Sequence, residues 1–136
     1  MYHELSPETG KFFDTMVSEE LMDLVNRDGK RPGGFCTSFP KYNRPYIFSN
    51  FNGTDHDITV LTHEAGHAFQ NYSSTHQPLV NYHWPTMEAA EIHSMSMEFF
   101  TWPRMRKFFK EDTEKFKYKH VSGSCLLYTS PSPRDV

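Results

Sequence analysis

The stretch VLTHEAGHAFQNY, residues 60–72, places two histidines four positions apart, with a glutamate directly after the first. If this segment is an α-helix, residues i and i+4 lie one turn apart on the same face, so the imidazoles of His63 and His67 can reach one metal ion. The motif therefore predicts a helix that runs to about residue 72. Gly66 inside that helix costs about 1 kcal/mol relative to alanine, and close approach of another backbone or of a substrate is a reason to keep it.

The pattern His-Glu-x-x-His is typical of a catalytic zinc site. Zinc accepts imidazole and carboxylate ligands tetrahedrally and can keep one position open for water. Glu64 stands beside the first ligand, where it can take a proton from such a water rather than bind the metal. The alternative interpretation is an exposed polar turn of helix that binds nothing. We expect one Zn²⁺ per chain and a third ligand from another element. The candidates downstream are His76, His83, Glu88, Glu91, His93 and Glu98.

The three candidate glutamates share a helix that we predict over residues 87–102. Glu91 and Glu98 are seven residues apart and therefore point the same way, two turns from each other. One of them can bind the metal while the other holds a ligand histidine through its free ring N–H. Glu88 remains an alternative ligand, and a solvated helix position is the more common role of any single glutamate. His93 lies about 200° round the helix from Glu91 and is expected to face away from the metal.

Two further structural segments are predicted before the motif. Residues 6–28 indicate a helix, because Ser6 is a suitable N-cap, a proline follows at the first helical position, and Gly29 lies beyond the last apolar residue. The aromatic and β-branched runs 35–39 and 44–51 indicate a hairpin-like pair of strands.

The metal helix is expected to begin near Asp55 or Asp57, after the turn NGTDHD. A polar, proline-containing connection follows it, and Pro103 ends or kinks the second long helix. A third helical stretch is predicted over residues 104–120.

Composition limits the class of protein. A chain of 136 residues can form one modest domain but hardly two, and an aromatic content of 15% argues against disorder. A net charge of −3, with no basic stripe beyond RMRKFFK, gives no sign of a nucleic-acid partner. No membrane-spanning run or export signal is evident, so we expect no membrane partner and a cytoplasmic location. The two cysteines make no disulfide framework, and Cys36 is expected to be a buried small hydrophobe.

A family resemblance selects the third ligand. HEAGH followed by EIHSMSME resembles the thimet oligopeptidase and oligoendopeptidase F group of zinc metallopeptidases, and is most similar to the oligoendopeptidase F branch. That family carries His-Glu-x-Gly-His and, further along, Glu-x-x-Ser with another Glu after it. Glu91, Ser94 and Glu98 occupy those places here. The resemblance implies that His63, His67 and Glu91 bind zinc, that Glu64 is the general base, and that Glu98 supports a ligand from behind.

The resemblance also implies a fold and an activity. The fold is expected to be mainly α, a helical fragment of a zincin-type catalytic domain with a short β-hairpin or small sheet beside the metal helix. The activity is zinc-dependent hydrolysis of peptide bonds in short peptides. The alternatives are a zinc-binding helical domain without catalysis and a small helical domain with a fortuitous motif.

An edge strand near the zinc pairs with the extended peptide in members of the family. We assign that role to the segment YIFSNF, and an ordinary core strand is the alternative. The residues so assigned are Tyr46, Ile47, Phe48, Ser49, Asn50 and Phe51.

The end of the chain changes character. CLLYTSPSPRD resembles the conceptual translation of a transposase sequencing adaptor. We therefore expect residues 1–124 to be a partial metallopeptidase catalytic domain and residues 125–136 to be an adaptor-derived disordered tail. Members of the family are several times longer, and the histidine and tyrosines that stabilise the oxyanion come after this point. The chain is thus expected to be an inactive fragment whose missing partner is the C-terminal part of the same polypeptide.

Overall fold

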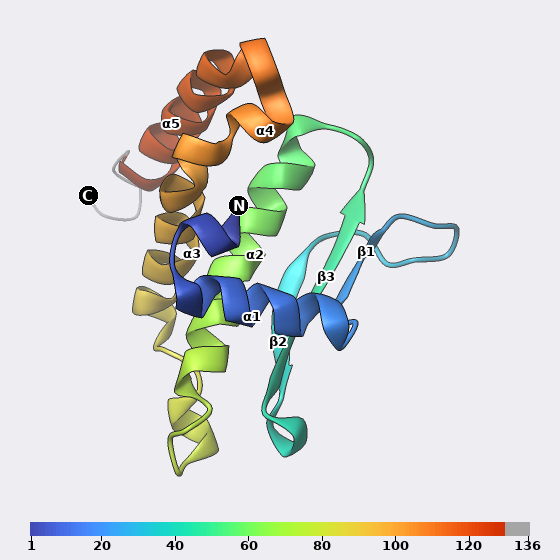
Figure 1. Cartoon of the computed structure of the whole chain (residues 1–136), viewed down its shortest axis with the longest axis vertical. Helices are drawn as coiled ribbons and strands as arrows, with labels where there is room; N and C mark the ends of the chain where they lie inside the picture. Colours follow the sequence, from blue (N-terminus) through green and yellow to red (C-terminus); the bar gives the residue numbers. More distant parts are fainter. Residues whose placement is uncertain (130–136) are drawn as a thin grey trace, which may run out of the picture. The chain divides into compact units, whose positions relative to one another are not determined.

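The computed structural model describes residues 1–129 and divides into two compact units, one of Met1–Thr101 and one that begins at Trp102. In the first unit, helices α2 and α3 run side by side and a small sheet lies along α2 (Figure 1). This confirms the expected mainly α fold with a small sheet beside the metal helix. The elements of the first unit are η1 (Tyr2–Glu4), α1 (Pro7–Ser18), β1 (Met22–Val25), β2 (Phe35–Phe39), η2 (Pro40–Tyr42), β3 (Arg44–Phe51), α2 (Asp55–Ser74), η3 (Val80–Tyr82) and α3 (Met87–Thr101).

Helix α1 begins where the sequence predicts. The Ser6 hydroxyl accepts a hydrogen bond from the Thr9 N–H at 3.1 Å, and the Thr9 hydroxyl accepts one from the Ser6 N–H at 3.1 Å. This reciprocal capping satisfies two backbone donors that the first helical turn leaves without partners.

The predicted continuation of this helix to residue 28 is wrong, because Met22–Val25 form strand β1. The Leu21 N–H donates to the Met16 carbonyl at 2.9 Å and closes the end of α1, while Glu20 adopts a left-handed φ of 54° that turns the chain. A glutamate gives no sequence signal for that conformation, which glycine or asparagine usually adopts. The strand is stabilised by pairing with β3, a contact distant in sequence.

The sheet has the order β1-β3-β2, with β3 parallel to β1 and antiparallel to β2. The predicted hairpin of residues 35–39 and 44–51 is confirmed, and it turns through Asn43 at a left-handed φ of 52°. In the described sheet, however, β3 is the central strand. The premise that Tyr46–Phe51 form an edge strand is therefore wrong, since the missed strand β1 occupies one side of it. The core-strand alternative describes this segment better.

Lys30 links β1 to β3. Its side chain is only 2% exposed, and its Nζ lies 3.0 Å from the Asp23 carboxylate, 2.9 Å from the Val25 carbonyl and 2.5 Å from the Ser49 carbonyl. Arg27 donates two further hydrogen bonds to Asp23, each 2.8 Å long. The hydrogen bonds from Arg27 and then from Lys30 hold the pKa of Asp23 well below its ordinary value.

The turn from β3 into α2 is built around Asp57, whose side chain is largely buried. Its Oδ2 accepts hydrogen bonds from the backbone N–H groups of Asn52, Gly53 and Thr54, at 3.0, 2.7 and 3.2 Å. These donors precede or open the helix and have no intrahelical partners. The carboxylate therefore fixes where the metal helix starts relative to the central strand.

The core of the first unit lies on the side of α2 that faces away from the two motif histidines. Ala65 and Ala68 are fully buried there, and the Phe12 ring of α1 packs edge-on against Phe69 with ring centroids 5.4 Å apart. An apolar stripe on one side of α2 thus anchors the helix and leaves the opposite side available for polar groups. The buried core cluster comprises Tyr2, Phe12, Met16, Ile47, Ala65, Ala68 and Met97.

The second unit contains helical segments of 3 to 17 residues and buries Met105 and Phe116. The single helix predicted over residues 104–120 is interrupted, because Lys110 adopts a φ of 48° between α4 and η5. Residues 125–129 of the expected tail continue helix α5, and residues 130–136 lie outside the described residues. No helix among the described residues is long and apolar enough to cross a membrane. The elements are η4 (Trp102–Arg104), α4 (Arg106–Phe109), η5 (Lys110–Asp112) and α5 (Thr113–Thr129).

Candidate metal centre

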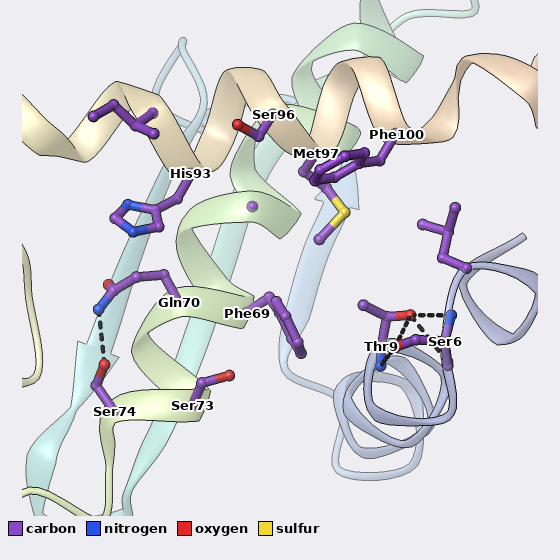
Figure 2. A pocket seen from close by; sticks show the side chains of 13 residues that line it. Ser6, Thr9, Phe69, Gln70, Ser73, Ser74, His93, Ser96, Met97 and Phe100 are labelled. Atoms are coloured by element: carbon purple, nitrogen blue, oxygen red, sulfur yellow. Dashed lines mark hydrogen bonds between the residues drawn. The ribbon is translucent and has the colours of Figure 1, made fainter.

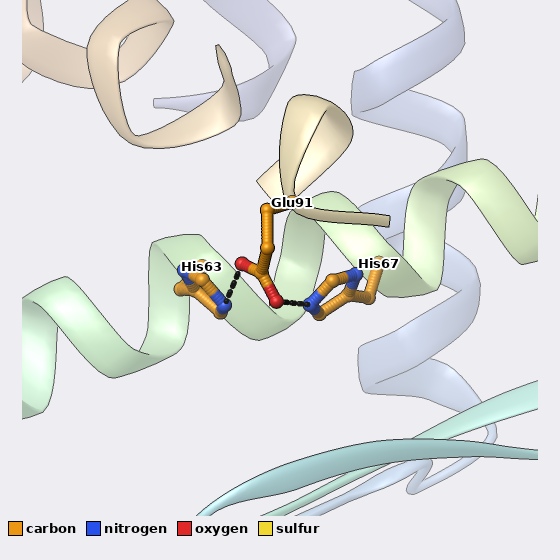
Figure 3. A group of neighbouring side chains, drawn as sticks. All are labelled: His63, His67 and Glu91. Atoms are coloured by element: carbon orange, nitrogen blue, oxygen red, sulfur yellow. Dashed lines mark ion pairs between the residues drawn. The ribbon is translucent and has the colours of Figure 1, made fainter. Parts of the chain in front are cut away.

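Three side chains from α2 and α3 converge on one point. One nitrogen each from His63 and His67 and a carboxylate oxygen from Glu91 all lie within 4.8 Å of one another. The His63 Nε2 is 3.2 Å from Glu91 Oε2, and the His67 Nε2 is 4.0 Å from Glu91 Oε1 (Figure 3). The two histidines come from successive turns of α2, and Glu91 reaches over them from α3. Of the candidates for a third ligand, Glu91 is the one that joins the histidines in this cluster.

Glu98 contacts the ring nitrogen of His63 that faces away from the cluster. Its carboxylate is largely buried, and its Oε1 lies 2.6 Å from the Nδ1 of His63. A hydrogen bond donated by Nδ1–H to this carboxylate fixes the imidazole tautomer and leaves the lone pair on Nε2, the nitrogen that faces Glu91. The seven-residue spacing of Glu91 and Glu98 thus gives two carboxylates that act on opposite nitrogens of one ring.

Glu64 lies beside the cluster without joining it. The residue is only 9% exposed, and the backbone of Cys36 in β2 lies close enough to lower the pKa of its carboxylate. Burial raises the pKa of Glu64, although the nearby His63 opposes the shift. A buried carboxylate of raised pKa next to a metal site is suited to accept and release a proton.

The two histidines differ in their affinity for protons. Burial lowers the pKa of His63, but the hydrogen bond to Glu98 and the nearby carboxylates outweigh it, so the pKa is raised overall. Burial, and then the charge of His63, lower the pKa of His67. A neutral imidazole is the form that binds a metal ion, so a cation at this site competes with a proton mainly at His63.

The reason for Gly66 is the crossing of α2 and α3. A Cβ atom on residue 66 would lie 2.5 Å from the Ser94 Cα and 2.7 Å from the His93 carbonyl oxygen. Both atoms belong to the backbone of α3, so they cannot move aside without shifting the helix. Close approach of another backbone, one of the two reasons expected from the sequence, is confirmed.

The other histidines and Glu88 have different surroundings. His83 is buried and its Nε2 hydrogen-bonds to the Gln77 carbonyl at 3.1 Å, while Glu88 is exposed at the start of α3. His76 is exposed, with Nδ1 2.8 Å from the Ser73 carbonyl. Neither Glu88 nor these histidines joins the cluster.

His93 lines a separate cavity of about 760 Å³ with Phe69, Gln70 and Met97 (Figure 2). None of the metal-facing side chains lines that cavity. His93 therefore faces away from the cluster of His63, His67 and Glu91, as its position on the helix predicts.

Two contributions to the site go beyond the roles predicted from the sequence. The Cys36 backbone lies close enough to lower the pKa of Glu64, and such an effect depends on where the sheet packs rather than on the residue type. The Cys36 side chain is half-buried, and burial raises the pKa of its thiol to about 12, in agreement with a packing role. The Ser94 hydroxyl is the second contribution, because it donates to a Glu91 carboxylate oxygen at 3.0 Å.

Comparison with known proteins gives one consistent result. Residues 4–126 match the sequence profile of Peptidase family M3. An oligoendopeptidase F homolog of Borreliella burgdorferi is 35% identical over 106 residues, which are 76% of this chain and 17% of that protein. A structure of PZ peptidase A with an inhibitor is 62% identical with a TM-score of 0.89, covering 92% of this chain and 22% of that one. An oligoendopeptidase F structure from Bacillus anthracis is 58% identical with a TM-score of 0.90, covering 92% and 23%. The chain thus spans a quarter or less of the length of these relatives.

Proposed function

Because the chain belongs to peptidase family M3, we propose that it forms part of the catalytic domain of a zinc-dependent endopeptidase that hydrolyses peptide bonds in short peptides. The observation that carries this proposal is the convergence of His63, His67 and Glu91 within 4.8 Å, with the buried Glu64 carboxylate beside them.

The donor set fits zinc. Two imidazole nitrogens and one carboxylate oxygen are a ligand set typical of catalytic zinc, which leaves a fourth position open. The hydrogen bond of Glu98 to His63 provides the outer support that such ligands usually have. When bound, zinc supplies Lewis acidity, which polarises a substrate carbonyl and lowers the pKa of a water molecule.

Glu64 performs the proton transfers. Its carboxylate accepts a proton from the attacking water and then delivers it to the leaving amine. Because burial raises its pKa, this carboxylate is a stronger base toward the attacking water than an exposed glutamate.

The peptide substrate pairs with β2 rather than with β3. In the described sheet β2 is an edge strand, and Ile47, the β3 partner of Cys36, donates its N–H to the Leu21 carbonyl instead, so the Cys36 N–H points away from β3. Because N–H and C=O of one residue point to the same side of an antiparallel ladder, the Cys36 carbonyl and the backbone groups of Ser38 face outward as well. A peptide added along this edge runs past the general base, with affinity from backbone hydrogen bonds and little sequence selectivity.

The second candidate function is zinc binding without catalysis, for the 136-residue chain by itself. The relatives are several times longer, and the family resemblance puts the oxyanion-stabilising histidine and tyrosines in the part not present here. Each such donor that is missing lowers the rate on the order of 100-fold or more.

Zinc stoichiometry tests the metal site. We expect one zinc per chain after dialysis, by elemental analysis, and loss of that zinc in His67→Ala and Glu91→Ala. Glu88→Ala is the matched control, because Glu88 is an exposed glutamate one turn earlier on the same helix. Zinc retained in Glu91→Ala, or lost in Glu88→Ala, would show that the ligand assignment is wrong.

Hydrolysis of an internally quenched peptide separates the two candidate functions. The wild-type chain is compared with Glu64→Gln, which keeps the zinc ligands and removes the base. Turnover that disappears in Glu64→Gln supports catalysis by this chain alone. Zinc binding with equal background rates in both proteins supports the non-catalytic alternative.

A further inference from the structure

Ser94 lies where α3 crosses α2 most closely. It is fully buried, and its Cα is the backbone atom nearest to the missing Cβ of Gly66. A small residue is required on both helices at such a crossing, because side chains there hold the backbones apart. Packing alone therefore accounts for a small residue at position 94, but alanine or glycine meets that requirement without a hydroxyl.

The hydroxyl contacts the proposed metal ligand. Ser94 Oγ lies 3.0 Å from Glu91 Oε2 and 3.2 Å from the Glu91 carbonyl oxygen. A serine hydroxyl has one proton, so these two acceptors share it, and the carboxylate is the charged one. The same Oε2 atom lies 3.2 Å from the His63 Nε2. The hydroxyl therefore holds the oxygen that faces His63.

Glu91 needs this support more than the histidines do. Its side chain is 46% exposed, against 22% for His63 and 15% for His67. Among the described residues, Ser94 is the one partner of the Glu91 carboxylate besides the two imidazoles. A long, partly exposed glutamate side chain loses considerable rotamer freedom when it is held in one arrangement.

We infer that Ser94 is a positioning residue for Glu91: its hydroxyl holds the carboxylate in the rotamer in which both oxygens face the histidines. The inference rests on the proposed metal site. It assigns to Ser94 a role beyond helix packing, in which the hydroxyl preorganises the third ligand before the cation binds. Gly66 and Ser94 then have complementary roles. Gly66 permits the close approach of α2 and α3, and Ser94 at that crossing orients the Glu91 carboxylate.

Ser94→Ala tests the inference, because it keeps the small size and removes the hydroxyl. We expect zinc affinity, measured by competition with a chromophoric chelator, to fall by about 10- to 100-fold, the usual effect of removing an outer partner of a ligand. We expect the metal-free variant to unfold at the wild-type temperature. With saturating Co²⁺ the visible absorption bands should shift, which reports ligand geometry directly. Ser96→Ala, on the same helix and with no hydrogen bond to Glu91 among the described residues, should leave all three measurements unchanged.

Three outcomes overturn the inference. Equal zinc affinity and equal Co²⁺ spectra in Ser94→Ala and Ser96→Ala show that the hydroxyl does not position Glu91, while the metal site itself stands. Unfolding of the metal-free Ser94→Ala chain shows that the hydroxyl serves the fold instead. Absence of zinc from the folded wild-type chain overturns the inference together with the proposed metal site.

Discussion

The Nδ1 atom of His63 lies 2.6 Å from Oε1 of Glu98, and the two residues are brought together by neighbouring helices. The Nδ1 atom is thereby hydrogen-bonded to a buried carboxylate, and the Nε2 atom faces Glu91. The ligand is oriented before any cation is present, because the carboxylate fixes both the rotation of the ring and its tautomer.

Glu98→Gln should weaken zinc binding by about 10- to 100-fold, because a neutral amide orients the His63 ring less strongly than a carboxylate. Competition with a chelator measures the change. Glu88→Gln is the control, since Glu88 lies on the same helix, is exposed and should have no effect. Equal losses in the two variants would contradict the role of Glu98.

Gly66→Ala should destabilise the first unit by roughly 1–3 kcal/mol, the usual cost of overpacking, despite the better helix propensity of alanine. The new Cβ would meet the Ser94 Cα at 2.5 Å and force α3 away from α2. Urea unfolding measures the free energy. Gly123→Ala is the matched control, because nothing lies within 4 Å of a Cβ there. That change should be neutral or stabilise by up to about 1 kcal/mol.

Asp57→Ala should lower the free energy of unfolding by roughly 1–3 kcal/mol, because it leaves backbone donors at the start of α2 without an acceptor. Asp57→Asn keeps a side-chain oxygen in the same place and should lose less. Thermal or urea unfolding of the two variants checks the order. An equal loss in both would mean that charge, not the hydrogen bonds, stabilises this turn.

Stability should fall in acid as Asp23 becomes protonated. The pKa of Asp23 is held below its ordinary value in the folded chain, by hydrogen bonds from Arg27 and then Lys30. A carboxyl whose pKa is lower in the folded state stabilises the fold above its unfolded pKa, near 4, and that stabilisation is lost as the pH falls through the folded value. The urea midpoint should therefore drop as the pH is lowered below about 4. Asp23→Asn should weaken this dependence, and Asp28→Asn, at an exposed position, should not.

Much of the cluster follows from residue spacing. The four-residue interval between His63 and His67 and the seven-residue interval between Glu91 and Glu98 each define one face of a helix. Helical geometry then predicts which side chains point together. Spacing within one helix gives no information on the neighbouring helix. The packing of α2 against α3 is implied instead by the family resemblance, which assigns zinc ligands to both helices.

The missed features share a physical cause. Strand β1 exists because it pairs with β3, and the turn before it uses a glutamate with positive φ, so neither local propensity nor turn residues predict it. Without β1, the predicted hairpin leaves one side of β3 unpaired, which is why the sequence indicates an edge strand there. The effect of the Cys36 backbone on the pKa of Glu64 has no sequence signal either, because it depends on where that backbone lies in the folded sheet.

The proposed ligands are divided between two helices that a long connection separates, with His67 on one side and Glu91 on the other. A cation bound by both helices acts as a cross-link that exists only in the folded chain, so its binding free energy becomes part of the stability of the fold. At a free zinc concentration one hundred times the dissociation constant, this linkage adds about 2.7 kcal/mol. The melting temperature of this unit then depends on the zinc concentration of its surroundings, and a strong chelator acts on it as a denaturant.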